Sequence, residues 1–131
     1  MKVLDSLKHE VIKIMDNDPA HDFEHVMRVY NNAKKISKQE KANQKLVLSA
    51  ALLHDIVSYP KSSKRSKFSS IDSAKKSKLI LKKYDFTAEE IIIVFDAIVD
   101  HSFSQNKIPQ TLEGKILQDA DRLDALGSIG I

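Results

Sequence analysis

The chain contains no cysteine, and it has only three glycines and three prolines among its 131 residues. The absence of cysteine excludes disulfides and thiolate metal sites, so a metal in this protein must be held by histidine, aspartate or glutamate. The three prolines, at positions 19, 60 and 109, separate long stretches with helical periodicity. No alternation typical of strands and no hairpin signal is present, so we expect an all-α fold.

Long apolar runs are also absent. The longest is too short to cross a bilayer, and the N-terminus lacks the apolar segment of a signal peptide. A hydrophobic content of 42% and a charged content of 30% fit one folded domain spanning residues 1–131. These features predict a soluble, cytoplasmic protein that does not bind membranes.

Six helices are predicted from apolar spacing and capping signals. The first ends at Asp16-Asn17-Asp18-Pro19, and Asp22 is the expected N-cap of the second. The third, Gln44 to Val57, is apolar around most of its circumference and is therefore expected to be buried.

The second half of the chain supplies the other three helices. Ser70 is expected to cap a helix that runs to about Tyr84, and Thr87 with Glu90 forms a capping box for a helix that runs to about His101. The last helix is expected from Leu112 to Leu126, with Gly127 as its stop.

His54 and Asp55 stand side by side in the almost wholly apolar run from Ala50 to Val57. Burying an unpaired carboxylate costs several kcal/mol, so this pair must be satisfied. Two interpretations are open: a hydrogen bond between the two side chains in the core, or a bound cation that takes an imidazole nitrogen and a carboxylate oxygen together.

Other histidines and aspartates favour the cation. His25 lies in the first turn of the second helix, and the last helix carries Asp119, Asp121 and Asp124. Helical bundles build metal sites from side chains on facing helices. A site of imidazoles and carboxylates suits Mn, Fe, Zn or Mg, and Mn is favoured here.

The order of these residues, His25, then His54-Asp55, then a distal aspartate, resembles the HD-domain superfamily of metal-dependent phosphohydrolases. Four blocks also resemble a bacterial subgroup of HD-domain hydrolases: residues 20–29, 50–57, 100–103 and 118–130. The resemblance implies an HD-domain helical bundle with a divalent metal bound by His25, His54, Asp55 and Asp121. Asp121 is selected because superfamily members usually end in a pattern like Ala120-Asp121-Arg122-Leu123. Asp124, three residues after Asp121, is expected to share its helix face and to support the ligands, its alternative being an unfavourable place in the final turn.

The same resemblance implies that His101 belongs to the active site. Without the resemblance, a histidine at a helix end would be interpreted as a structural residue. We expect it to bind a substrate phosphate or to protonate a leaving oxygen. His21 is expected to face the substrate, its alternative being a loop histidine or a cap partner. The basic loop residues Lys61, Lys64 and Arg65 are expected to hold phosphate, their alternative being a solvated loop.

One departure from the resembled proteins concerns proton transfer. Several nucleotide-cleaving HD proteins carry acidic residues a few positions after the His-Asp pair, whereas residues 56–60 of this chain include none. The candidates for proton transfer are therefore Asp55, His101 or the attacking water itself.

The resemblance predicts metal-assisted hydrolysis of a phosphate ester or phosphoanhydride of a nucleotide, for example of a triphosphate to a monophosphate and pyrophosphate. The alternative is a regulatory HD module that binds metal or nucleotide without turnover. Nucleic acid is not an expected partner, because few aromatic residues accompany the short basic loop.

The chain ends in the apolar segment Gly127-Ser128-Ile129-Gly130-Ile131, where members of the resembled subgroup usually continue with further helices. It is then either the N-terminal part of a longer family domain or a short gene product, or its end is buried by a partner. A homodimer is one such partner.

Overall fold

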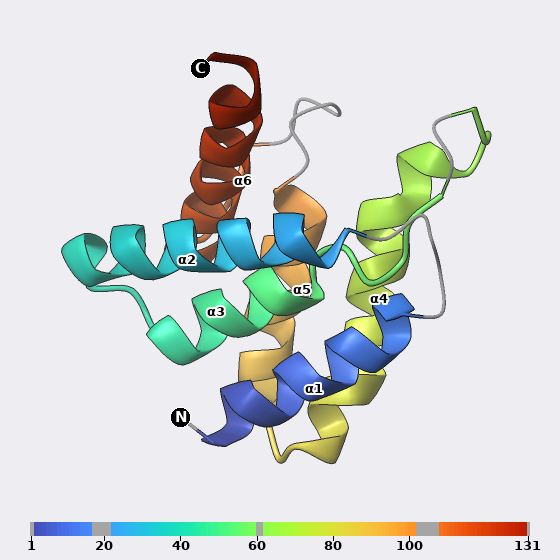
Figure 1. Ribbon diagram of the computed structural model, residues 1–131. Coiled ribbons are helices and arrows are strands. Elements are labelled where there is room, and N and C mark those ends of the chain that lie inside the picture. The colour runs from blue at the N-terminus through green and yellow to red at the C-terminus, as the bar shows by residue number, and fades with distance from the viewer. Residues whose placement is uncertain (1, 17–21, 60–61, 102–107, 131) are drawn as a thin grey trace.

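The computed structural model describes residues 2–16, 22–59, 62–101 and 108–130. These contain six α-helices and one short 3₁₀-helix, η1 (Ser66–Phe68), and no strand occurs within the described ranges. The α-helices are α1 (Lys2–Asp16), α2 (Phe23–Glu40), α3 (Gln44–Leu53), α4 (Ser69–Lys83), α5 (Ala88–Asp100) and α6 (Leu112–Gly130). The prediction of an all-α bundle of about six helices is confirmed (Figure 1).

Helix α3 lies at the centre of the bundle. Every residue from Leu46 to Leu53 is buried, as predicted from its apolar circumference. The other five helices all contact α3, and α6 stands across α2 at the upper end of the molecule in Figure 1. Because α3 is enclosed in this way, polar groups at its C-terminal end lie inside the protein.

Two of the predicted N-terminal caps, Asp22 and Thr87, are present where the sequence placed them. The Asp22 side chain accepts a hydrogen bond from the backbone N–H of His25 at 3.1 Å, which fixes the first turn of α2. Thr87 and Glu90 form the complete capping box at the start of α5. The N-terminal ends of α2 and α5 are therefore fixed by side-chain caps.

Helix α3 ends earlier than predicted, at Leu53 rather than Val57. His54 is its C-cap and Asp55 lies in the following turn. The reason lies in α4: the Ser73 hydroxyl accepts from the Val57 N–H at 3.0 Å and donates to the Val57 carbonyl at 3.1 Å. A side chain thus takes the backbone groups that a longer helix would have used.

Two other predicted ends also differ. Helix α4 begins at Ser69, directly after η1, and not behind a Ser70 cap. Helix α6 continues through Gly127 to Gly130, and no glycine in the described residues has a positive φ. Glycine permits the left-handed stop but does not require it. Among the described residues, no helix is both long enough and apolar enough to cross a membrane.

Candidate metal centre

Three predicted ligands from different parts of the chain meet at one place. His25 comes from the first turn of α2, His54 from the C-cap of α3 and Asp121 from α6. Each offers one nitrogen or oxygen, and these three atoms all lie within 4.8 Å of one another. The packing of α2 and α3 side by side, with α6 across α2, brings them together (Figure 1).

His54 shows most directly that the cluster suits a cation. The side chain is buried, and its Nδ1 lies 2.6 Å from the carbonyl oxygen of Ala51. Since a carbonyl only accepts, Nδ1 carries the proton and Nε2 presents a lone pair. That Nε2 is buried and has no hydrogen-bond partner. A buried acceptor without a partner costs about 1–3 kcal/mol, which a bound metal ion would offset.

The charge state of His54 suits the same role. Burial lowers the pKa of His54 below its ordinary value, so the imidazole is neutral at pH 7. Metals bind the neutral imidazole and compete with the proton. The tautomer and the charge therefore both leave Nε2 available.

His25 lies between two carboxylates. Its Nδ1 is 2.6 Å from Asp124 Oδ2, and its Nε2 is 3.3 Å from Asp121 Oδ1. The pKa of His25 is raised to about 9, mainly by the hydrogen bond to Asp121 and further by that to Asp124. With Nδ1 held by Asp124, the Nε2 of His25 faces Asp121. The supporting role of Asp124 toward a metal ligand stays a prediction.

Asp124 is itself held by Arg28, whose Nε donates to Asp124 Oδ1 at 2.5 Å. Sequence reasoning assigned no role to Arg28. The available signal was its spacing, because residues three apart on a helix share a face and Arg28 follows His25 by three. Asp119, by contrast, is exposed on α6, as the helical angle from Asp121 predicts.

His101 is a second buried histidine beside the cluster, after His54. It follows α5, and its Nδ1 donates to the carbonyl oxygen of Ile98, as His54 does to Ala51. Its Nε2 lies 4.0 Å from Asp121 Oδ2, and its ring centroid is 5.1 Å from that of His54. Two acceptors therefore face each other, which favours a cation or a proton donor between them. Burial and the neighbouring His54 lower the pKa of His101 to about 4.

Asp55 lies at the edge of this arrangement. It is partly exposed in the turn after His54, and it is not among the three residues whose ligand atoms share the 4.8 Å limit. Its charge nevertheless acts on the cluster. The pKa of His25 is raised mainly by the hydrogen bond to Asp121, and the negative charge of Asp55 raises it slightly further. A metal-binding role for Asp55 stays a prediction.

The residues predicted to bind substrate near the basic loop have different surroundings. His21 and Lys61 lie outside the described residues. Lys64 is exposed in the loop before η1. Arg65 donates to Asp72 Oδ2 at 3.0 Å, and its guanidinium carbon lies 5.6 Å from the centroid of the Tyr59 ring. The Tyr59 hydroxyl donates to the same Asp72 oxygen at 2.6 Å. A phosphate at Arg65 would therefore compete with Asp72.

Comparison with known proteins matches residues 22–126 to the HD domain family. The uncharacterized protein YpgQ of Bacillus subtilis is 36% identical over 124 residues, which are 90% of this chain and 57% of YpgQ. The crystal structure of an HD-superfamily hydrolase from Bacillus thuringiensis has 32% identity and a TM-score of 0.76, covering 98% of this chain and 61% of that chain.

Another solved structure is that of Bacillus subtilis YpgQ in complex with ADP, with 29% identity and a TM-score of 0.72. It covers 98% of this chain and 61% of that chain. The chain thus spans less than two thirds of the length of YpgQ. The family match covers all three clustered residues and most of the helical bundle. The chain belongs to the HD domain family.

Proposed function

We propose that this protein is a metal-dependent phosphohydrolase that acts on a phosphate ester or phosphoanhydride of a nucleotide. The observation that carries the proposal is the buried, unpartnered Nε2 of His54, which shares one cluster with His25 and Asp121. Membership of the HD family and the resemblance to HD-superfamily hydrolases support the hydrolase class. The ADP complex of YpgQ supports a nucleotide as the substrate.

His25, His54 and Asp121 would hold the divalent ion, with Asp55 as the proposed fourth ligand. When bound, such an ion lowers the pKa of a coordinated water and offsets charge on phosphoryl oxygens. Asp124 fixes the His25 ring from behind, and the Ala51 carbonyl fixes the His54 ring. Both imidazole rings are therefore oriented before the substrate binds. Side chains that are already oriented favour both metal binding and the reaction.

His101 is the proposed proton-transfer or phosphate-binding group. Its Nε2 faces Asp121, and its low pKa of about 4 makes it an acceptor at neutral pH in the metal-free protein. At this pKa His101 would take a proton from the attacking water only as a weak base, so Asp55 is the competing candidate. Because Nδ1 already donates to Ile98, His101 would bind phosphate only when Nε2 is protonated. Lys64 and Arg65 supply the positive charge proposed to hold phosphate.

A second candidate function is a regulatory module that binds metal or nucleotide without turnover. The observation that favours it is the absence of a carboxylate in residues 56–60, together with the engagement of Arg65 by Asp72. Both reduce the groups available to assist the chemistry. Binding without release of phosphate or pyrophosphate would identify this function.

The experiment is a screen of nucleoside mono-, di- and triphosphates with Mn, Fe, Zn and Mg, after the metal content of the purified protein has been measured. We expect release of phosphate or pyrophosphate that falls at least about 100-fold in His54→Ala and Asp121→Ala. Asp119→Ala is the matched control, because Asp119 lies on the same helix but is exposed. Equal activity in all three variants would contradict the proposal.

A further inference from the structure

Helices α2 and α6 are joined by a polar contact that involves no metal-ligand side chain. The side-chain nitrogen Nδ2 of Asn32, on α2, donates to the backbone carbonyl oxygen of Ala120, on α6, at 3.2 Å. Asp121, a proposed metal ligand, directly follows Ala120 in the sequence. The contact therefore lies one residue from the metal centre and uses none of its ligand atoms.

Asn32 belongs to a row of polar side chains along α2. His25, Arg28 and Asn32 follow one another at spacings of three and four residues, so they share one face of the helix. His25 and Arg28 contact the carboxylates of α6, whereas Asn32 contacts its backbone. A contact to a carboxylate changes when that side chain rotates, but a bond to a backbone carbonyl restrains the helix itself. Asn32 therefore restrains how α6 lies on α2.

Helix α6 needs this restraint because its apolar packing ends at Ala120. Ile116, Leu117 and Ala120 are buried, whereas none of the residues from 121 to 126 is. Figure 1 shows the C-terminal part of α6 standing above α2. The Ala120 side chain is a single methyl group, which makes few packing contacts with a neighbouring helix. Apolar packing alone therefore restrains the Asp121 position weakly.

A small displacement of α6 would disturb the metal centre. One residue along an α-helix corresponds to a shift of about 1.5 Å and a rotation of about 100°. The ligand oxygen of Asp121 lies within 4.8 Å of the ligand nitrogens of His25 and His54, and such a rotation would turn it away from both. We infer that Asn32 is a positioning residue, which sets α6 on α2 so that Asp121 faces His25 and His54. The consequence for metal binding rests on the proposed function, whereas the consequence for the geometry does not.

Three variants of the full chain separate positioning from packing. Asn32→Leu has nearly the same volume but no donor, and apolar replacement of a partly buried polar group can leave stability almost unchanged. Asn32→Ala removes the donor without any risk of a clash. Asn31→Ala is the matched control, because Asn31 is the adjacent residue of the same type and is exposed.

The first measurement is made in chelator and needs no metal. It is the nuclear Overhauser effect between the ring protons of His25 and the β-protons of Asp121, whose His25 Nε2 and Asp121 Oδ1 atoms lie 3.3 Å apart. We expect this signal to weaken or disappear in both Asn32 variants and to persist in Asn31→Ala. An unchanged signal in both Asn32 variants would overturn the inference.

The second measurement is the affinity for Mn by calorimetry, together with the urea midpoint in chelator. We expect Asn32→Leu to weaken Mn binding by roughly two- to thirtyfold while its urea midpoint stays close to that of the unchanged protein. Asn31→Ala should leave both unchanged. A loss of affinity that occurs only in variants with a lowered urea midpoint would overturn the inference, because Asn32 would then serve stability alone.

The two measurements also separate this inference from the proposed function. If the unchanged protein binds no Mn, the proposed function fails, and the signal between His25 and Asp121 still decides whether Asn32 positions Asp121. If the unchanged protein binds Mn and both Asn32 variants bind it equally well, the metal centre stands and the inference is overturned.

Discussion

The imidazole of His25 and the carboxylate of Asp124, ninety-nine positions apart in the chain, form a 2.6 Å contact between Nδ1 and Oδ2. The contact joins the first turn of α2 to the later part of α6, and Arg28 holds the other oxygen of Asp124. It fixes which face of the His25 ring is turned to Asp121. We therefore predict that Asp124 positions His25 for metal binding.

Replacing Asp124 should loosen the metal centre without removing a ligand. Asp124→Asn keeps the shape but weakens the hold on His25 Nδ1 and on Arg28, so we expect metal affinity to fall about 10–100-fold. The measurement is a calorimetric titration of the metal-free protein with Mn. Asp119→Asn, exposed on the same helix, is the control and should bind Mn like the unchanged protein. Unchanged affinity in Asp124→Asn would show that the contact does not position His25.

The metal-free protein should be most stable near pH 6.5. His25 has a folded-state pKa of about 9 against an ordinary 6.5, so its stabilising contribution is full below pH 6.5 and is lost as the pH rises through 9. His101 has a folded-state pKa of about 4, so the unfolded chain binds the proton first and stability falls as the pH drops from 6.5 through 4.

Urea unfolding in chelator from pH 4 to pH 9.5 measures this profile. We expect His25→Gln to reduce the slope on the alkaline side and His101→Gln to reduce the slope on the acid side, where the lowered pKa values of His54, Asp121 and Asp124 also contribute. Added Mn should restore stability on the alkaline side, because deprotonated His25 is then a ligand. A profile that keeps both slopes in both variants would show that other groups cause them.

Helix identity and most cap positions were predictable because they depend on local patterns. Asp22 and the Thr87–Glu90 box act within one turn, so short-range sequence reveals them. The end of α3 was not predictable from local sequence, because it depends on Ser73, sixteen residues beyond Val57. The run Ala50–Val57 reads as continuous helix until α4 is placed beside it.

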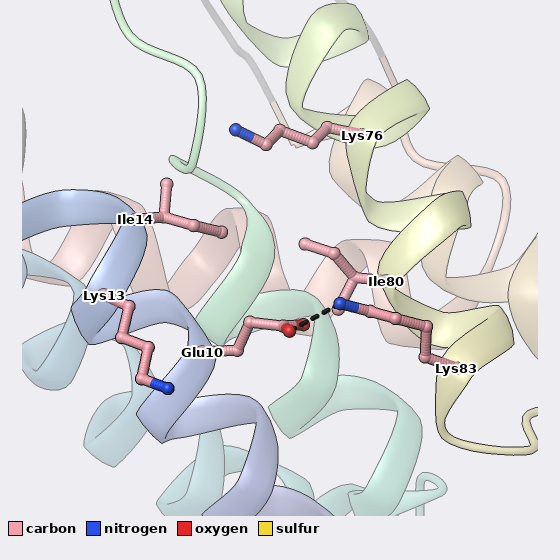
Figure 2. A pocket seen from close by; sticks show the side chains of 6 residues that line it. All are labelled: Glu10, Lys13, Ile14, Lys76, Ile80 and Lys83. Atoms are coloured by element: carbon pink, nitrogen blue, oxygen red, sulfur yellow. Dashed lines mark hydrogen bonds and ion pairs between the residues drawn. The ribbon is translucent and has the colours of Figure 1, made fainter.

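The candidate site shows the same division. The residue types and their order predicted His25, His54 and Asp121, and the fold brings those three together. The role of Arg28 and the capture of Arg65 by Asp72 depend on distances between elements, which a single sequence does not contain. The groove between α1 and α4, lined by Glu10, Lys13, Ile14, Lys76, Ile80 and Lys83, is a tertiary feature for the same reason (Figure 2).

Ser73 should matter far more than its neighbour one turn away. Ser73→Ala removes the partner of both the Val57 N–H and the Val57 carbonyl, and we expect a loss of about 1–3 kcal/mol in the free energy of unfolding. Ser77 is equally buried, but its hydroxyl donates only to the Ser73 carbonyl within α4. Ser77→Ala should therefore cost less than Ser73→Ala in urea unfolding. The reverse order would contradict the account of how α3 ends.

The central claim is that His25, His54 and Asp121 hold one divalent ion. A crystal structure of the Mn-loaded protein, with an anomalous difference map, tests it most directly. We expect one peak within about 2.3 Å of His54 Nε2 and at bonding distance from His25 and Asp121. A map without a peak there, with His54 Nε2 still lacking a partner at saturating Mn, would contradict it.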